Sequence, residues 1–307
     1  MGRRKKGRNI SGILLLDKPA GITSNGALQR VKSLFFAQKA GHTGSLDPIA
    51  TGILPICLGE ATKFSGFLLN ADKSYVAECQ LGVVTRSGDT EGEVVSERPV
   101  EGVTEEKITQ ALQQFKGDIQ QIPPMHSAIK VNGQPLYKLA HQGIEIEREP
   151  RQVTIFELEF ISYDAEAERM VIQVHCSKGT YVRTLVEDIG EVLGCGAHVT
   201  ALRRTTLGPY LEQDVLTMEQ LELIREEEDK SGLDQRLLSL DSAVDDYEAV
   251  VLDADSSYYI RQGQPVQISG APDQGWIRIY NEQKEFLGVG EIDSDGRVAP
   301  RRLVASS

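Results

Sequence analysis

The sequence predicts a mixed α/β (α+β) protein with a large mixed, mainly antiparallel sheet, followed by a small C-terminal β domain. Strand-like and helix-like segments are interleaved up to residue 248, but they do not alternate strictly, as they would in a doubly wound parallel sheet. From Val250 onward, short alternations of apolar and polar residues are separated by turn residues, which is typical of a small β domain. We therefore divide the chain into residues 1–248 and 249–307.

The individual elements follow from the spacing of apolar residues. Residues 13–16 form a short apolar strand, and Ser24 is the expected N-cap of a helix over residues 25–34, which places Leu28, Val31 and Leu34 on one face. The same reasoning predicts a helix at 105–115 and strands at 75–81, 153–160, 170–176, 265–268, 276–280 and 286–290.

Two segments are expected to lie outside the main core. Residues 124–152 are rich in Gly, Gln, Lys and His, and this length and composition suit a mobile binding element. Residues 226–246 begin with an acidic run and continue as a polar stretch. We expect a solvated helix end and a linker there, with no functional site.

The composition is that of a globular protein from a reducing compartment. Of the 307 residues, 25% are charged and 40% are hydrophobic, so the chain can bury a sizeable core. No apolar run approaches the roughly 20 residues of a membrane span, and the basic start leads into no signal-peptide apolar region. The four cysteines lack the spacing of a disulfide framework. We expect a cytoplasmic protein with no membrane association.

The net charge of −12 is unevenly distributed along the chain. Residues 1–70 hold ten Lys or Arg against three Asp or Glu, whereas residues 211–307 hold nine against twenty-one. Because charges are screened over roughly 8 to 10 Å, a basic face for RNA phosphates can coexist with the acidic total. That face is expected to contain Arg3, Arg4, Lys5, Lys6, Arg8, Arg30, Lys32, Lys39 and Lys63. The amino-terminal cluster can equally be a disordered solubilising tail.

One apparent metal site is rejected. His175, Cys176, Cys195 and His198 have a spacing that could be interpreted as a zinc tetrad. In a strand over residues 170–176, however, His175 and Cys176 would point to opposite faces and could hardly bind one ion. We expect no metal site, and we expect the cysteines to be small core residues.

The most informative segment is residues 41–55, where a single carboxylate, Asp47, lies among glycine, proline and small hydroxyl residues. Pro48 disfavours the helical region for Asp47, and the glycines permit close backbone approaches, so the carboxylate is expected on a rigid loop. The residues alone leave two interpretations open. One is an Asp-Pro turn whose carboxylate bonds its own backbone; the other is a catalytic acid.

A family resemblance favours the catalytic acid. Residues 41–52 fill every fixed position of the pattern G-H-x-G-x-L-D-P-x-A-x-G, which is the catalytic loop of TruB-type tRNA pseudouridine synthases. Four further blocks resemble the same family in the same order, namely residues 16–24 (LDKPAGITS), 72–75 (DKSY), 177–183 (SKGTYVR) and 202–204 (LRR). Five blocks in order are a far more specific signal than any one of them.

The resemblance implies the pseudouridine synthase fold with a cleft across the sheet, a PUA-like C-terminal module, and isomerisation of the T-loop uridine at position 55 of tRNA. It implies Asp47 as the nucleophile, but leaves open whether Asp47 attacks the sugar, attacks the base or first takes a ribose proton. Arg183 is the implied partner, since a guanidinium opposes the cost of burying the carboxylate. Without that context, Arg183 would be expected to pair with Glu187, four residues on.

The base must be extracted from a folded loop, and an aromatic side chain usually replaces the lost stacking. By analogy with the family, Tyr75 stacks on the flipped base and removes its C5 proton, and Tyr181 contacts the target from the other side. His42 fills the gap left in the T-loop. Leu202 contacts the uridine, although it can equally be plain core.

The remaining implied roles concern support and RNA binding. Lys18 and Pro19 are expected to brace the pocket, and the segment 124–152 is an insertion that closes over the RNA stem-loop. In the C-terminal module, Arg297, Arg301 and Arg302 are candidate contacts to RNA phosphates.

The implied reaction oxidises and hydrolyses nothing, so one carboxylate suffices and no cofactor or metal is expected. We expect a monomer that binds tRNA without an obligatory protein partner. A tRNA-folding chaperone that uses the same cleft remains an alternative. An aspartate-based glycosidase would need a second carboxylate roughly 5 to 9.5 Å away, and none stands out.

Overall fold

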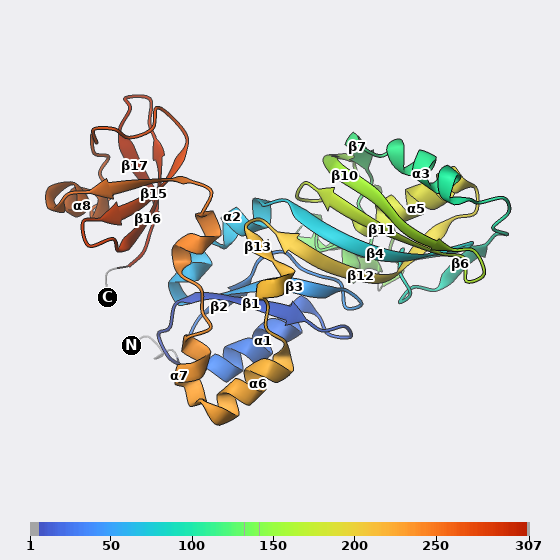
Figure 1. Ribbon diagram of the computed structural model, residues 1–307, viewed down its shortest axis with the longest axis horizontal. Helices are drawn as coiled ribbons and strands as arrows, with labels where there is room; N and C mark the ends of the chain where they lie inside the picture. Colours follow the sequence, from blue (N-terminus) through green and yellow to red (C-terminus); the bar gives the residue numbers. More distant parts are fainter. Residues whose placement is uncertain (1–5, 132, 141, 306–307) are drawn as a thin grey trace.

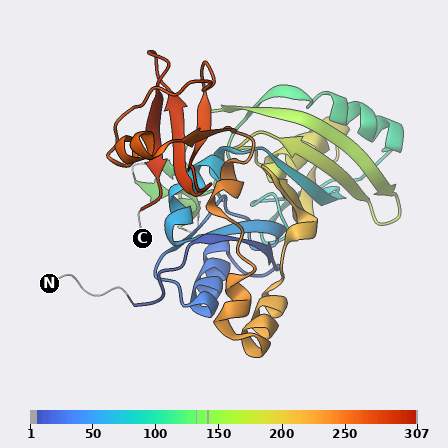
Figure 2. The same cartoon turned by 60° about the vertical axis from the view of Figure 1, so that its left-hand side comes forward.

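The computed structural model describes residues 6–305, except residues 132 and 141. The predicted basic residues Arg3, Arg4 and Lys5 therefore lie outside the described residues. One long sheet, a helical cluster beneath its left end and a small separate sheet at the upper left make up the molecule (Figure 1). In a second view, turned by 60°, the small sheet comes forward and partly overlaps the long one (Figure 2).

In the described part of the chain, the main sheet has nine strands. Their order is β1 (Gly12–Lys18), β3 (Thr51–Leu58), β12 (Ala197–Leu207), β4 (Lys73–Leu81), β11 (Arg169–Cys176), β10 (Arg151–Asp164) and β7 (Gly117–Gln121), with β2 (Ala40–His42) beside β3 and β13 (Tyr210–Leu211) beside β12. Among these pairings only that of β12 with β3 is parallel, and it joins two residue pairs. The predicted fold class, a mixed and mainly antiparallel sheet with helices, is confirmed.

Helices cover one face of the broad half of the sheet. Helix α3 (Glu105–Gln113) packs on β10, and α5 (Val182–Leu193) packs on β12. On β4, Tyr75 and Ala77 are buried whereas the alternate residues Val76 and Glu78 are half-buried. Successive strand residues face opposite sides of a sheet, so Tyr75 belongs to the covered face.

A second cluster of helices lies against β1 and β3. It contains α1 (Ser24–Phe35), α6 (Met218–Glu227) and α7 (Asp229–Asp234), which contact one another (Figure 1). The short β3–β12 pairing joins this half of the sheet to the broad half. The loop that carries Asp47 directly precedes β3 and therefore lies at the junction.

Helix α1 corrects one prediction. Its N-cap is Thr23, whose hydroxyl accepts a hydrogen bond from the Gly26 N–H at 3.0 Å. Ser24, the predicted cap, is the first helical residue and is buried. Its hydroxyl donates to the Leu46 carbonyl at 3.0 Å and accepts from the Leu46 N–H at 2.7 Å. Both residue types cap helices well, so only the approach of the Asp47 loop decides between them.

The C-terminal sheet has its own core and also packs on the main body. It contains β14 (Glu248–Leu252), β15 (Trp276–Asn281), β16 (Phe286–Ile292) and β17 (Val298–Leu303), with α8 (Ala254–Arg261) beside it. The rings of Phe67 and Trp276 pack edge to face with their centroids 5.2 Å apart, and the ring centroids of Phe64 and Phe286 lie 5.4 Å apart. The strand expected at 265–268 is wrong, because that segment forms only a single bridge from Val266 to Val298.

The polar segment 226–246 also differs from expectation. Leu233 and Val244 are fully buried, so the segment is part of the core and not a solvated linker. Sparse apolar residues anchor it, although acidic neighbours dominate its composition. Elements not yet named are η1 (Gly59–Lys63), α2 (Ser65–Asn70), β5 (Val83–Thr85), β6 (Val94–Glu97), β8 (Lys130–Val131), β9 (Gln134–Pro135), α4 (Leu136–Ala140), η2 (Glu212–Asp214) and η3 (Leu240–Val244).

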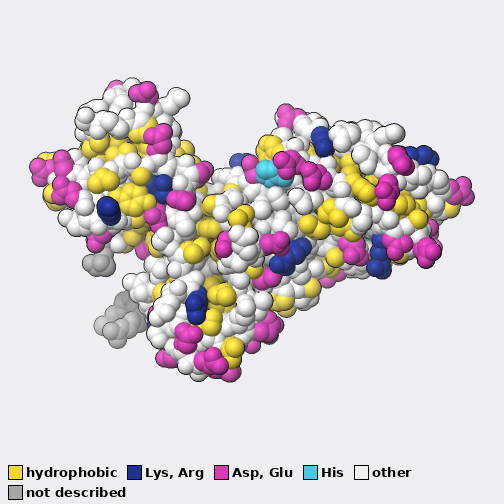
Figure 3. All heavy atoms as spheres, viewed as in Figure 1, with side chains coloured by type: hydrophobic (Ala, Val, Ile, Leu, Met, Phe, Trp, Pro, Cys, Tyr) yellow, Lys and Arg dark blue, Asp and Glu magenta, His cyan; other side chains and the backbone are white. Residues whose placement is uncertain are grey.

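The face of the molecule seen in Figure 3 carries acidic side chains throughout, and its Lys and Arg side chains form only small, separate groups. A broad basic surface for RNA is not found on this face. None of the helices in the described ranges combines the length and apolarity that a membrane span requires.

Candidate active site

Asp47 lies on the loop between β2 and β3, and a buried lysine fixes one end of this loop. Lys18 is fully buried at the end of β1. Its ammonium donates hydrogen bonds at 2.9, 2.8 and 3.3 Å to the carbonyls of Pro19, Ile22 and Pro48. Burial lowers the pKa of Lys18 to about 8. This lysine therefore connects the 19–22 turn to the residue next to Asp47, and the bracing role expected for Lys18 and Pro19 stays a prediction.

A buried arginine fixes the other end of the loop. The Arg204 Nε atom donates to the Ile53 carbonyl at 2.8 Å, and Nη2 donates to the Gly44 carbonyl at 3.2 Å. Gly52 has a φ of +98°, and a Cβ there would lie 2.2 Å from the Arg204 carbonyl oxygen. Only glycine permits both this conformation and this approach. The loop is thus rigid, as its sequence predicts.

Arg183, at the start of α5, binds the Asp47 carboxylate through two nitrogens of its guanidinium group. Its Nε lies 2.9 Å from Asp47 Oδ2, and its Nη2 donates to Oδ1 at 3.2 Å. The guanidinium also donates to the carbonyls of Ser87 and His126, both at 2.8 Å, and Nη1 lies 3.4 Å from Asp89 Oδ2. The Arg183 side chain is only 5% exposed, whereas that of Asp47 is 36% exposed. A fixed cation therefore presents a carboxylate that solvent, and hence a substrate, can reach.

The charges around Asp47 act in opposite directions. Burial raises the pKa of the Asp47 carboxyl, and Arg183 counteracts that shift. Asp89 favours the protonated form, whereas Lys18 favours the carboxylate. Glu187, the alternative partner for Arg183, is not the residue it grips; burial and Asp188 raise the pKa of Glu187 to about 7. Arg183 is therefore the main group that keeps Asp47 ionised.

Tyr75 lies opposite Arg204 in the β4–β12 register and is 8% exposed. Residues directly opposite each other on neighbouring antiparallel strands place their side chains on the same face, so Arg204 and Tyr75 lie side by side. Burial raises the pKa of the Tyr75 phenol, Arg204 lowers it, and the Asp47 charge is close enough to raise it further. Tyr75 and Asp47 are thus neighbours, although 28 residues separate them in the sequence.

Tyr181 and the 124–152 segment also meet at the site. The Tyr181 N–H donates to Gln121 Oε1 at 3.0 Å, and the neighbouring Arg183 donates to the His126 carbonyl of the 124–152 segment at 2.8 Å. Burial raises the pKa of the Tyr181 phenol, and the charges of Arg183 and Asp47 both act on it. The structure therefore brings Asp47, Arg183, Tyr75 and Tyr181 together.

His42 and Leu202 lie at the edge of this group. His42 is half-buried on β2, and burial, with Arg204 nearby, lowers its pKa. Leu202 is 7% exposed and pairs with Ala77 across β12 and β4. Its burial leaves the choice between substrate contact and plain core open.

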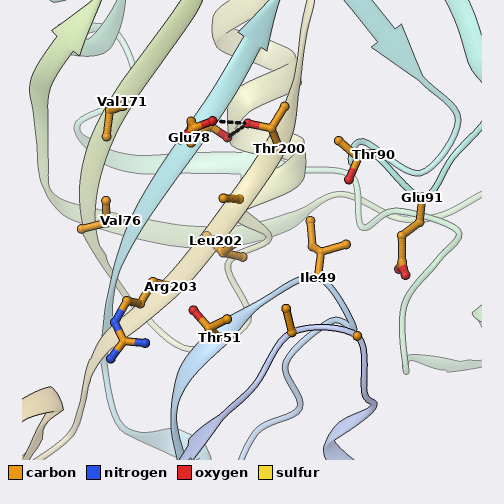
Figure 4. A pocket seen from close by; sticks show the side chains of 13 residues that line it. Ile49, Thr51, Val76, Glu78, Thr90, Glu91, Val171, Thr200, Leu202 and Arg203 are labelled. Atoms are coloured by element: carbon orange, nitrogen blue, oxygen red, sulfur yellow. Dashed lines mark hydrogen bonds between the residues drawn. The ribbon is translucent and has the colours of Figure 1, made fainter.

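A pocket of about 590 Å³ opens on the opposite face of the sheet. The pocket is lined by Val76 and Glu78 of β4, Thr200 and Arg203 of β12, and Ile49 of the Asp47 loop (Figure 4). Because side chains alternate along β4, the pocket lies behind Tyr75 and not around it. Arg203 is bound there by Asp17, with contacts of 3.1 and 3.0 Å.

The rejected zinc tetrad is dispersed. Cys176 is buried, whereas His175 is half-buried and lies 5.0 Å from the Phe156 ring. His198 Nδ1 lies 2.9 Å from the Val83 carbonyl oxygen. Over residues 6–305, apart from 132 and 141, no group of three or more His, Cys, Asp or Glu side chains could hold a metal ion.

Sequence reasoning missed two residues of the site. Asp89 is 2% exposed and contacts Arg183; its signal was a second carboxylate in a small-residue run, Ser87 to Gly92, much like that of Asp47. Arg204 stood in a recognised block but received no role. Its burial and its contacts cannot be predicted from strand alternation alone.

Comparisons with known proteins match most of the chain to one family. Residues 32–182 match the model described as "TruB family pseudouridylate synthase (N terminal domain)". Residues 183–245 match "tRNA pseudouridylate synthase B C-terminal domain", and residues 249–304 match "Pseudouridine synthase II TruB, C-terminal".

Similar proteins span nearly the full length. The "tRNA pseudouridine synthase B" of Coxiella burnetii (strain Dugway 5J108-111) is 54% identical over 297 residues, which is 97% of this chain and 96% of that protein. The protein of the same name from Aeromonas salmonicida (strain A449) is 55% identical over 309 residues, covering 98% and 96%. A solved "Cbf5-Nop10-Gar1 Complex" contains a chain with a TM-score of 0.72 and 26% identity, covering 95% of this chain and 84% of that one.

Proposed function

Because the chain belongs to the TruB family of tRNA pseudouridine synthases, isomerases that convert uridine to pseudouridine in tRNA, we propose that its target is the T-loop uridine at position 55 and that Asp47 is its nucleophile. The observation that carries the assignment of Asp47 is the two-pronged contact from Arg183 to a carboxylate that remains partly exposed. A turn-forming aspartate would not need a buried guanidinium.

The reaction sets the requirements that the site must meet. The bond from C1′ to N1 breaks, the uracil turns, C5 bonds to C1′, and the C5 proton leaves while N1 gains one from solvent. A carboxylate can attack the sugar or the base, or take a ribose proton, and only the ionised form does so. Arg183 supplies that form by opposing the burial of Asp47.

The aromatic residues serve the flipped base. Tyr75 stacks on the base and takes the C5 proton, and Tyr181 contacts the base from the side of the 124–152 segment. Their places support these roles, because the charge of Asp47 acts on both phenols, Tyr75 lies opposite Arg204, and the Tyr181 backbone is bound to Gln121. His42 fills the space that the flipped nucleotide leaves in the T-loop, and Leu202 contacts the uridine.

RNA binding uses the segment 124–152, which closes over the stem-loop and is already linked to the site through the His126 carbonyl. The division into a catalytic domain, residues 1–248, and a PUA-like domain, residues 249–307, belongs to the same proposal. RNA phosphates dock away from the acidic face of Figure 3. The protein acts as a monomer in the cytoplasm, without a cofactor or an obligatory protein partner.

The test is to incubate the protein with unmodified tRNA and to map pseudouridine at every position. We expect product at position 55 and none when that position carries cytidine. Product at another uridine would contradict the T-loop assignment. Assisted tRNA folding without any pseudouridine would favour the chaperone alternative.

A further inference from the structure

Arg204 is a buried cation that has no carboxylate partner. It is 1% exposed, and within the described residues its guanidinium takes part in no salt bridge. Its hydrogen-bond partners are the carbonyls of Ile53 and Gly44, and Tyr75 lies directly opposite it on β4. Burying an uncompensated charge is costly, by several kcal/mol per ion. A favourable role for this charge therefore requires an anion that is present during the reaction.

The neighbouring arginine shows that this arrangement is specific. Arg203 faces the other side of β12 and is held by two carboxylates, Asp17 at 3.0 Å and Glu212 at 2.9 Å. Residues that are adjacent in the same strand thus have opposite environments. Only the side that faces Tyr75 lacks a negative partner.

The surroundings of Arg204 favour an anion. Lys73, on β4, is 7% exposed, and burial and Arg204 lower its pKa to about 8. His42, on β2, has its pKa lowered by burial and by Arg204. Lys73 and His42 therefore place a second cation and a neutral imidazole near Arg204. Within the described residues, the cross-strand neighbour of Arg204 is Tyr75, whose phenol can become negatively charged.

The chemistry of the last step supplies a reason for that anion. A neutral phenol is too weak a base to take a proton from carbon, whereas a phenolate is competent. We propose that Arg204 is a positioning residue that stabilises the phenolate form of Tyr75 and thereby enables it to remove the C5 proton. This inference rests on the proposed function, in which Tyr75 performs that step.

The proton balance is complete without a further reactant. Once C5 is bonded to C1′, its C–H bond breaks, the electron pair returns to the uracil ring and the proton binds the Tyr75 oxygen. The phenol then releases the proton to solvent before the next turnover. The groups that act on Tyr75 are Arg204 from β12, the Cys176 thiol from β11 and Asp47 from its loop. Burial, which has the largest effect, opposes the phenolate, as do Cys176 and Asp47, whereas Arg204 favours it.

The test compares single-turnover rates on tRNA that carries hydrogen or deuterium at C5 of the target uridine. We expect Arg204→Gln to slow the reaction roughly a hundredfold and to raise the ratio of the two rates, because proton removal becomes limiting. Arg204→Lys keeps the charge and should lie between this variant and the wild type. The matched control is Arg203→Gln, which should keep the wild-type ratio even where it destabilises the protein.

A second measurement removes the ambiguity of a fold defect. Replacing Tyr75 by 3-fluorotyrosine makes the phenol more acidic, so it should restore part of the rate in the Arg204→Gln protein or, if that protein does not fold, in the Arg204→Lys protein. A slow Arg204 variant with an unchanged isotope ratio and no rescue would reduce Arg204 to a support for the loop. Weaker tRNA binding with a smaller salt dependence, and an unchanged ratio, would instead show that Arg204 holds an RNA phosphate.

Failure of the proposed function would look different. If Tyr75→Phe turned over as fast as the wild type, the proton-removal role of Tyr75, and this inference with it, would fall. If wild-type protein formed no pseudouridine at position 55, the assigned target would fall while the Arg204 isotope test remained valid on whichever uridine reacts.

Discussion

The arginines of the site and those of the C-terminal sheet are held in opposite ways. Arg183 is 5% exposed and grips a carboxylate that reaches solvent. Arg297 and Arg301 are 43% and 49% exposed, and each pairs with acids of its own sheet, Arg297 with Asp293 and Asp295 and Arg301 with Glu291. Exposed pairs contribute only about 0–1 kcal/mol.

The buried arginines of the site serve the chemistry, whereas neighbouring acids neutralise exposed arginines of the C-terminal sheet. The buried guanidinium group of Arg183 binds Asp47, and buried Arg204 lies opposite Tyr75. Three arginines near the C-terminus are candidate contacts to RNA phosphates, but two of the three already pair with acidic side chains. Within the described residues Arg302 donates to a backbone carbonyl, that of Arg301 at 2.9 Å, and forms no salt bridge.

The largest effect on activity is expected from a substitution of the buried Arg183. Arg183→Met should slow isomerisation by about 10²–10³-fold, the usual cost of losing a fixed electrostatic contact. Burial already raises the pKa of Asp47, and loss of the Arg183 cation should raise it further. As the pH is lowered, the variant should therefore lose activity at a higher pH than the wild type does. Single-turnover rates from pH 5 to 8 measure both effects, with Arg183→Lys as the charge-preserving control. An acid limb that does not move would contradict this role.

The Tyr75 side chain combines two roles that substitutions can separate. Tyr75→Phe keeps the ring, so tRNA affinity should change little while turnover falls sharply. Tyr75→Leu also loses the stacking, which is worth about 1–3 kcal/mol per base, so affinity and turnover should both fall. Equilibrium binding and single-turnover assays on both variants measure the difference. Equal affinities for the Phe and Leu variants would remove the stacking role.

Glu187 should make the stability of the folded protein depend on pH. Its pKa is raised to about 7 in the folded protein, so the native state binds this proton more tightly than the unfolded state. The resulting stabilisation is present below about pH 4.5 and is lost as the pH rises through 7. Glu187→Gln should therefore have a higher Tm than the wild type at pH 8 and a smaller advantage at pH 5. Thermal unfolding at both pH values tests this; an equal difference at both would exclude Glu187 as the source.

The smallest effects, on tRNA affinity, are expected from substitutions of the exposed arginines of the C-terminal sheet. Arg301→Ala removes a side chain that is paired with Glu291 and should leave tRNA affinity nearly unchanged. If Arg302 contacts a phosphate, Arg302→Ala should reduce the slope of log affinity against log salt by about 1. Titrations at several salt concentrations compare the two variants. A larger loss for Arg301 than for Arg302 would reverse the distinction between paired and unpaired arginines.

The fold was predictable where apolar alternation is regular. The strand expected at 75–81 is present as β4, Lys73–Leu81, and the helix expected at 105–115 as α3, Glu105–Gln113. Predictions failed where tertiary contacts outweigh local preference. Ser24 binds the Asp47 loop instead of capping α1, and the acidic composition of residues 226–246 concealed the buried Leu233.

The site was predictable where a motif places several groups on one short segment. The Asp47 loop is rigid because its glycines and prolines allow close contacts, and these residues are visible in the sequence. Asp89 and Arg204 reach the site through contacts between distant segments; Arg183, for example, binds the Ser87 carbonyl 96 residues away. Neither a spacing rule nor a periodicity predicts such contacts.

The measurement that tests the account most directly is single-turnover formation of pseudouridine by Asp47→Asn on unmodified tRNA. This substitution keeps the shape and removes the charge that Arg183 holds. We predict a loss of about a thousandfold or more in rate, with tRNA affinity within a few fold of wild type. Product at near wild-type rate would contradict the assignment of Asp47 as the nucleophile.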